Sequence, residues 1–221
     1  MRFSLQHLAD RVNPFGTMIR LGGGEDLWVG CPLRVHRRCL DPMFSLANQI
    51  AYNGHMVQQT ASIAPLDHLP QSLWVDCTSN LAQEHWIPQQ GAEMVSFCRQ
   101  LLGMGVAPTD IFVISPFKSV SKQVETLIRR HGDLTGLQSG TIHTFQGKEA
   151  PIVLLLLGGN PERPGAMAWA SERPNVLNVA LTRAQHRFYV IGDRNLWRRY
   201  PHFDQLDRQL PPSELQVTFN E

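Results

Sequence analysis

The sequence predicts an α/β domain in which a mainly parallel sheet is covered by helices on both faces. Residues 152–157 are apolar without interruption, and residues 187–191 form a shorter segment of the same kind. Such runs are typical of strands that are buried on both faces of a parallel sheet. Between them, apolar residues recur at helical spacing, at Val176, Val179, Ala180 and Ala184. Alternating strands and helices imply three layers, and 221 residues are enough to bury their core.

Residues 1–30 are predicted to be a flanking segment, and residues 31–221 a single domain. Apolar residues that share one helical face lie near the start, at Leu5, Leu8 and Val12. The glycines at 22–24 then interrupt any regular element. No Lys-Ser or Lys-Thr pair follows them, and no GxxxxGK[ST] motif occurs anywhere in the sequence. The chain therefore lacks a phosphate-binding loop of its own.

A helix is predicted to begin near Pro42, with Asp41 or a residue close to it available as its cap. Its apolar residues follow a helical period, at Phe44, Ala47, Ile50 and Ala51. Further strands are predicted at residues 72–76, 110–114 and 141–143. Further helices are predicted over residues 91–102, through Val120, Val124, Leu127 and Ile128, and at Leu196-Trp197. The composition predicts connectors or turns at residues 57–70, 78–90, 134–140 and 161–174.

The overall composition restricts the possible partners and the cellular environment. The formal charge is +1, so binding to nucleic acid would have to come from a local patch. The four cysteines contain no CxxC pair, which indicates neither a zinc site nor a disulfide framework. Reduced thiols are typical of cytosolic proteins. The N-terminus has no apolar run long enough for a signal peptide or a membrane span. We expect a cytoplasmic protein that has no membrane segment and no metal site of its own.

Polar residues of the C-terminal half cluster at the ends of the predicted elements. They lie in one loop, at His143, Thr144, Gln146, Lys148 and Glu149, and at the end of a helix, at Arg183. In open α/β sheets, ligands bind at the carboxyl ends of the strands. We therefore expect a ligand site at these strand ends.

Two phrases in this region resemble known motifs. HTFQGKE before one predicted strand and NVALTRA before another are similar to the last two motifs of superfamily 1 helicases. The most similar branch includes the nonsense-mediated-decay helicase and its DNA-processing relatives. The resemblance implies a RecA-like domain, the second of the two in such a motor. In that family, ATP with Mg²⁺ lies in the cleft between the domains, and the first domain supplies the phosphate loop and the magnesium carboxylate.

The resemblance also implies roles for individual residues around ATP. Arg183 and Arg38 match arginines that contact the γ-phosphate, and arginine suits this role because its fork is planar, charged and bidentate. Arg37 stands where the family has an aromatic residue, and one extra residue precedes the proline. Whether Arg37 or Arg38 faces the nucleotide therefore stays open. Nucleotide contacts are implied for three more residues: Glu149 at the ribose hydroxyls, Gly147 through close backbone approach and Gln146 as a link to nucleic acid.

A second set of residues resembles the positions that contact single-stranded DNA or RNA. They are Ser115, Pro116 and Phe117 in a turn similar to the fourth motif region, and Thr141, His143 and Thr144. Phe117 could stack on a base or pack against its own helix, and His143 could instead be a core histidine. Lys118 and Lys122 could contact phosphate or be solvated. The sequence shows no element, such as a recognition helix, that would contact base edges. We therefore expect this surface to bind nucleic acid with little sequence preference.

These implications lead to one main hypothesis and two alternatives. The main hypothesis is the C-terminal motor domain of an ATP-dependent DNA or RNA helicase, inactive in isolation. Its partners would be a single strand and the N-terminal RecA-like domain of the same parent protein, which favours Met1 as the edge of a fragment. The first alternative is a non-enzymatic nucleic-acid-binding or regulatory module. The second, a small-molecule hydrolase, is disfavoured because no GxSxG motif is present.

Overall fold

The computed structural model describes residues 8, 12, 16–20, 26–30, 34–60, 66–79 and 81–213. Backbone contacts divide the chain into two units, Met1–Val35 and His36–Glu221. In the first unit, strand β1 (Thr17–Arg20) pairs with β2 (Asp26–Val29) in antiparallel register. The predicted N-terminal helix lies largely, and the glycine run entirely, outside the described residues. The predicted boundary between residues 30 and 31 stays a prediction.

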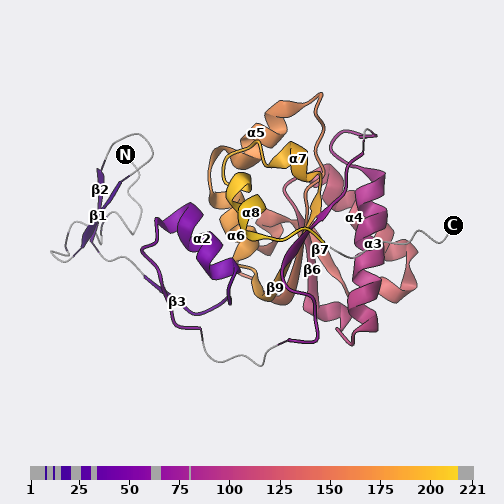
Figure 1. Cartoon of the computed structure of the whole chain (residues 1–221), viewed down its shortest axis with the longest axis horizontal. Coiled ribbons are helices and arrows are strands. Elements are labelled where there is room, and N and C mark those ends of the chain that lie inside the picture. Colours follow the sequence, from indigo (N-terminus) through magenta and orange to yellow (C-terminus); the bar gives the residue numbers. More distant parts are fainter. Residues whose placement is uncertain are drawn as a thin grey trace. The chain divides into compact units, whose positions relative to one another are not determined.

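The second unit is built on a five-stranded sheet whose neighbouring strands are all parallel (Figure 1). The strand order is β5-β9-β8-β6-β7. The bounds are Leu73–Asp76 for β5, Ile111–Ser115 for β6, Gln138–Thr141 for β7, Ala150–Leu156 for β8 and Ala184–Gly192 for β9. Two shorter strands, β3 (Val35–His36) and β4 (Val57–Gln58), lie outside this sheet.

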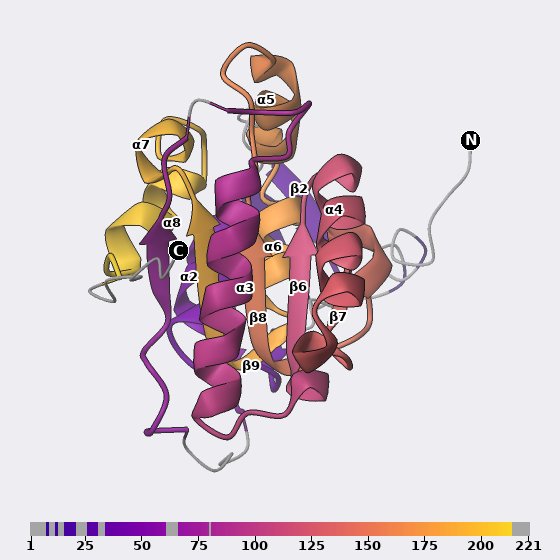
Figure 2. The same ribbon diagram turned by 90° about the vertical axis from the view of Figure 1, so that its right-hand side faces the viewer.

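Helices cover both faces of the sheet, which confirms the predicted three-layer α/β fold. Helices α3 (Pro88–Gly103) and α4 (Lys118–Arg130) lie on one face (Figure 2). Helices α2 (Met43–Tyr52) and α6 (Asn175–Leu181) lie on the other. The remaining helices are α5 (Pro164–Glu172), α7 (Arg194–Trp197) and α8 (Phe203–Gln209). In the described part of the chain, no helix combines the length and the apolar character needed to cross a membrane.

The two central strands explain why their sequences are so apolar. Strand β8 lies between β6 and β9, and β9 lies between β8 and β5. Because helices cover both faces as well, most side chains of both strands are buried. No residue of the segment 152–157 is more than 1% exposed. The uninterrupted apolar run therefore predicted this strand correctly.

Several sequence predictions outside the two central strands are wrong, among them the turn expected at residues 134–140, which contains the start of β7. The strand expected at residues 141–143 is Gln138–Thr141, and Ile142–Phe145 forms a 3-10 helix, η3. Strand β7 can be polar because it is an outermost strand with a neighbour on one side only, and it is less buried than β8 or β9. The connector expected at residues 161–174 contains α5, whose good helix formers were obscured by proline and glycine. Ala184 begins β9 and is not part of the preceding helix.

A buried amide joins the carboxyl ends of two strands that are not neighbours. The side chain of Gln90 is on α3, and the residue is only 1% exposed. Its Oε1 accepts from the N–H of Gly158 at 2.9 Å, after the end of β8. Its Nε2 donates to the carbonyl of Cys77 at 3.3 Å, after the end of β5. Gln90 thus satisfies two backbone groups at the edge where the parallel strands terminate.

We predict that Gln90→Leu lowers the free energy of unfolding by about 1–3 kcal/mol for each backbone group left without a partner. Urea denaturation measures this change. The matched control is Gln89→Leu in the same helix turn, where the native residue is exposed, and it should stay within about 0.5 kcal/mol of the wild type. Equal effects of the two substitutions would contradict the bridging role of Gln90.

Candidate functional site

Five of the predicted site residues lie in one segment that runs from the carboxyl ends of the sheet strands back to their amino ends. Strand β7 ends at Thr141 and β8 begins at Ala150, and both run parallel to β6. Residues 142–149, here called the crossing segment, must therefore return along the length of the sheet. The segment starts with η3, which contacts α6. One end of the segment therefore lies where the strands end, here called the carboxyl edge. Its other end lies where the strands begin, here called the amino edge.

A tight turn in the crossing segment explains the glycine of the HTFQGKE phrase. The N–H of Lys148 donates to the carbonyl of Phe145 at 3.0 Å. Between them, Gln146 has φ −60° and ψ 123°, and Gly147 has φ +87°. These angles define a type II β-turn, whose third position favours glycine because a side chain is strained there. The predicted backbone contact of Gly147 with a nucleotide stays a prediction.

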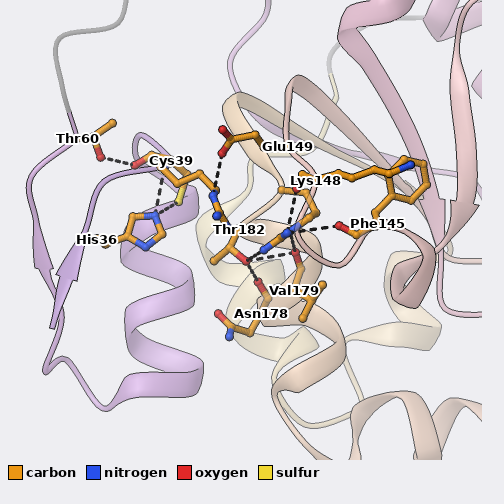
Figure 3. Close-up of polar contacts among 11 residues, drawn as sticks. His36, Cys39, Thr60, Phe145, Lys148, Glu149, Asn178, Val179 and Thr182 are labelled. Carbon is orange, nitrogen blue, oxygen red and sulfur yellow. Dashed lines mark hydrogen bonds and ion pairs between the residues drawn. The ribbon is translucent and has the colours of Figure 1, made fainter. Parts of the chain in front are cut away.

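The side chain of Arg183 links this turn to helix α6 through hydrogen bonds. Its Nη1 donates to the carbonyls of Lys148 at 2.9 Å and Phe145 at 3.3 Å. Its Nε donates to the carbonyl of Val179 at 3.2 Å, and its Nη2 to Oγ1 of Thr182 at 3.2 Å (Figure 3). Arg183 is only 6% exposed. Four of the five guanidinium N–H groups are therefore used to hold the protein's own backbone and hydroxyl groups.

Arg38 is paired with Glu149 at the same corner of the domain. Its Nε lies 2.8 Å from the Glu149 carboxylate, and both side chains are partly exposed. The pKa of Arg183 is lowered, mainly by burial and further by the charge of Arg38, while Glu149 opposes this shift. Because Arg183 donates to the carbonyl of Lys148, the residue before Glu149, all three charged groups lie close together. Arg37, by contrast, is exposed and takes no part in this cluster in the described residues.

The segment that carries Arg38 is fixed on both sides. His36 Nε2 accepts from the backbone N–H of Cys39 at 3.1 Å and lies 2.9 Å from its Sγ (Figure 3). The N–H of Leu40 donates to the carbonyl of Gln185 in β9 at 3.0 Å. The Asp41 carboxylate accepts from the N–H of Ser45 at 3.0 Å and so satisfies a donor in the first turn of α2, although Pro42 and not Asp41 is the N-cap residue. Arg38 therefore extends from an anchored backbone.

The nucleotide residues predicted from the sequence lie at the amino edge of the sheet. Glu149 directly precedes β8 and Arg183 directly precedes β9, and the first residues of these strands, Ala150 and Ala184, are register partners. The expectation that the whole site lies at the carboxyl ends of the strands is therefore wrong for these residues. Glu149 and Arg183 each end a connection that returns the chain to the start of a strand. Both residues therefore lie at the amino ends of the strands.

The residues that were predicted to contact nucleic acid lie at the carboxyl edge. Thr141 ends β7, and its hydroxyl is 3.0 Å from that of Thr144. His143 is exposed, so the alternative of a core histidine is wrong. A groove of about 550 Å³ is lined by Thr141 and His143 together with Glu84, His85, Pro116, Phe117, Lys118, Ser119 and Trp169. The crossing segment thus connects this groove to the charged cluster at the opposite edge.

The turn after β6 does not present its side chains as expected. Ser115 is 1% exposed, and its Oγ accepts from the N–H of Phe117 at 3.2 Å. Phe117 is 6% exposed, and His85 stacks on its ring at 4.4 Å between centroids. Pro116 is also buried, although it lines the groove. Direct stacking of a base on Phe117 does not fit this arrangement, because the imidazole of His85 already covers the ring.

Sequence reasoning missed three residues of these surfaces. Trp169 and His85 line the groove, and His36 anchors the segment that carries Arg38. The helix formers around Trp169 were an available signal for α5. No local signal pointed to His85 or His36, because their roles depend on partners that the fold brings near. Among the residues that the structure describes, no group of three His, Cys, Asp or Glu side chains could hold a metal ion.

Comparison with known proteins identifies relatives of this chain. A family model described as an AAA domain matches residues 30–195. The DNA replication ATP-dependent helicase/nuclease DNA2 of Gallus gallus is 27% identical over 179 residues, which cover 79% of this chain and 18% of that protein. The 3'-5' exoribonuclease HELZ2 of Homo sapiens is 31% identical over 144 residues, 57% of this chain and 5% of that protein.

A plant relative extends this comparison. The Regulator of nonsense transcripts 1 homolog of Arabidopsis thaliana is 25% identical over 122 residues, 53% of this chain and 10% of that protein. The chain therefore spans less than a fifth of the length of each of these three relatives.

His36, in the segment that carries Arg38, is expected to make the stability of the domain depend on pH. The pKa of His36 is lowered, mainly by burial and further by Arg38. As the pH falls below about 6.5, the unfolded chain binds this proton before the folded chain does, so stability falls. Protonation also removes the Nε2 lone pair that accepts from Cys39. Burial lowers the pKa of His85, His186 and His202 as well, so the wild type has several such contributions.

We predict that His36→Gln reduces the loss of stability between about pH 7 and pH 5, because its amide oxygen can accept from Cys39 without titrating. Urea denaturation at a series of pH values measures the slope. His68→Gln, at an exposed histidine, is the matched control and should leave the slope as in the wild type. A wild-type slope in His36→Gln would contradict the assignment.

Proposed function

We propose that this chain, which belongs to the AAA domain family and is the second RecA-like domain of a superfamily 1 helicase, supplies the positively charged wall of an interdomain ATP site. The observation that carries the proposal is the convergence of Arg38, Arg183 and Glu149 at one corner. The parent protein would then be an ATP-dependent DNA or RNA helicase. Its first domain would supply the phosphate loop and hold Mg²⁺, since this sequence contains no GxxxxGK[ST] motif.

The chemistry of the corner fits a nucleoside triphosphate. Guanidinium groups bind phosphate oxygens in pairs, and a carboxylate accepts from ribose hydroxyls. Phosphoryl transfer depends mostly on positioning and on positive charge at the γ-phosphate. In this proposal Arg38 and Arg183 provide that charge, Glu149 binds the ribose, and Gly147 and Gln146 contribute the adjoining turn.

The ion pair between Arg38 and Glu149 suggests how the site becomes competent. A partly exposed pair of this kind contributes only about 0–1 kcal/mol, so it exchanges readily for a stronger partner. The phosphate chain attracts Arg38 and the ribose engages Glu149, which separates the pair. Arg183 is more constrained, because it must give up contacts with the turn to reach a phosphate. Binding at this corner therefore acts directly on the crossing segment.

A single strand of DNA or RNA would bind at the opposite end of the crossing segment. Thr141, His143 and Thr144 present hydroxyl and imidazole groups to the carboxyl edge, where they could contact the sugar-phosphate backbone. Contacts of this kind position a strand without reading its sequence. We infer a cytoplasmic protein in its reduced state, supported by the free thiols of Cys39, Cys77 and Cys98.

We predict that Arg38→Ala, in a protein that contains both motor domains, lowers the rate of ATP hydrolysis by about 10³- to 10⁵-fold, as expected for an arginine finger. Arg183→Lys should also impair hydrolysis, because an ammonium cannot hold the turn and a phosphate as a fork does. Steady-state ATPase assays measure both. Arg99→Ala is the control, since Arg99 is exposed and pairs with Asp133 elsewhere on the surface.

The isolated chain provides the complementary test. It should hydrolyse ATP negligibly, because half of the site is absent. Rapid magnesium-dependent turnover by this chain alone would refute the half-site proposal. Unchanged hydrolysis in Arg38→Ala and Arg183→Lys would instead favour a non-enzymatic module that retains the fold.

A further inference from the structure

Helix α5 presents a large aromatic side chain beside the groove at the carboxyl edge. In both ribbon views the helix lies beyond one end of the sheet (Figures 1 and 2). Its Met167, Ala170 and Ser171 are buried and attach it to the domain. Trp169, on the open side, is 52% exposed and lines the groove. An indole ring left open beside a groove offers a flat face on which a planar ligand group can stack.

Stacked ring side chains form the floor of the groove near Trp169. The imidazole of His85 stacks on the buried ring of Phe117 with an interplanar angle of 25°, and Phe117 contacts Trp197 in turn. The backbone carbonyl of His85 accepts from the N–H of Gly159 at 3.0 Å. This stacked arrangement holds the imidazole in place. The groove therefore combines a fixed aromatic floor with an exposed aromatic wall.

The groove continues along α4 past a pair of lysines. A second hollow of about 460 Å³ shares Glu84, Lys118 and Ser119 with the first and extends to Lys122 and Gln123. Lys118 and Lys122 are four residues apart on α4, so both ammonium groups lie on one side of the helix. Both residues are exposed. Glu84 is the one carboxylate among the residues that line the two hollows, so the path carries a net positive charge.

We propose that Trp169 stacks on a base of the bound single strand, while Lys118 and Lys122 contact the phosphates that follow. The inference rests on the proposed function, since it requires that a strand bind at the carboxyl edge. An aromatic face next to cations and hydroxyls matches the alternation of base and phosphate in a nucleotide chain. In this proposal Trp169, and not Phe117, is the aromatic residue that contacts a base, because His85 covers the ring of Phe117.

Binding of a short fluorescent oligothymidylate and an oligouridylate to this chain tests the proposal by anisotropy. Trp169→Ala should weaken binding by about 5- to 150-fold, the equivalent of about 1–3 kcal/mol for one stacked base. The dependence of affinity on salt should stay unchanged, because tryptophan carries no charge. Trp169→Phe should recover most of the affinity. Lys118→Ala should lower the salt slope by about one.

Two controls separate stacking from a general loss of structure. Met104→Ala, at another exposed apolar residue, should bind both oligonucleotides as the wild type does. An abasic oligonucleotide of the same length should bind equally to the wild type and to Trp169→Ala, because it has no base to stack. The comparison of oligothymidylate with oligouridylate shows whether the site prefers DNA or RNA.

The outcomes distinguish this inference from the proposed function. If the wild type binds the oligonucleotides and Trp169→Ala binds them equally well, the stacking role is refuted and the proposed strand site stands. If the wild type binds neither oligonucleotide, both the stacking role and the strand site are refuted, while the ATPase variants still test the motor. If Trp169→Ala weakens abasic and base-containing strands alike, Trp169 supports the groove only and the inference fails.

Discussion

The arrangement of this domain depends on the buried guanidinium of Arg183. Its donors hold the carbonyls of Phe145 and Lys148 against helix α6, and hydrogen bonds from a charged donor contribute about 1.5–3 kcal/mol each. Few other side chains could do this, because a single planar fork must reach carbonyls on two elements at once. The carbonyl of Arg183 itself accepts from the N–H of Ala150 at 3.0 Å. The residue therefore fixes both the turn and the start of β8.

This arrangement links two surfaces that lie at opposite edges of one sheet. The crossing segment and α6 contact one another along the same face, and a hollow of about 250 Å³ between them is lined by residues of both. A change at the charged corner must alter the contacts of Arg183, and hence the turn that leads to His143. Coupling between distant sites requires such an element with two arrangements that both ligands favour differently. The turn held by Arg183 is the part of this domain that lies between the two surfaces.

The sequence was informative where a local pattern had a single physical cause. The apolar run of β8 predicted a central strand because such a run is stable only where it is enclosed, and the apolar period after Pro42 predicted helix α2. The motif phrases brought Arg38, Arg183 and Glu149 into one hypothesis, and the fold places these three side chains together. The sequence failed where tertiary contacts decided the outcome. Phe117 is covered by His85 from a distant loop, and the edge at which Glu149 lies depends on the direction in which the crossing segment returns.

The central claim is that Arg38 and Arg183 stabilise charge on a transferring phosphate, beyond their contribution to holding the domain together. Transition-state analogues bind 10²- to 10⁸-fold more tightly than substrates because they engage such groups selectively. The most direct test compares the Kd of ADP with that of ADP–aluminium fluoride for a protein containing both motor domains. The account predicts that Arg38→Ala weakens binding of the aluminium fluoride complex by at least about 10²-fold while the Kd of ADP changes little. Equal weakening of both ligands, or no change in either, would contradict it.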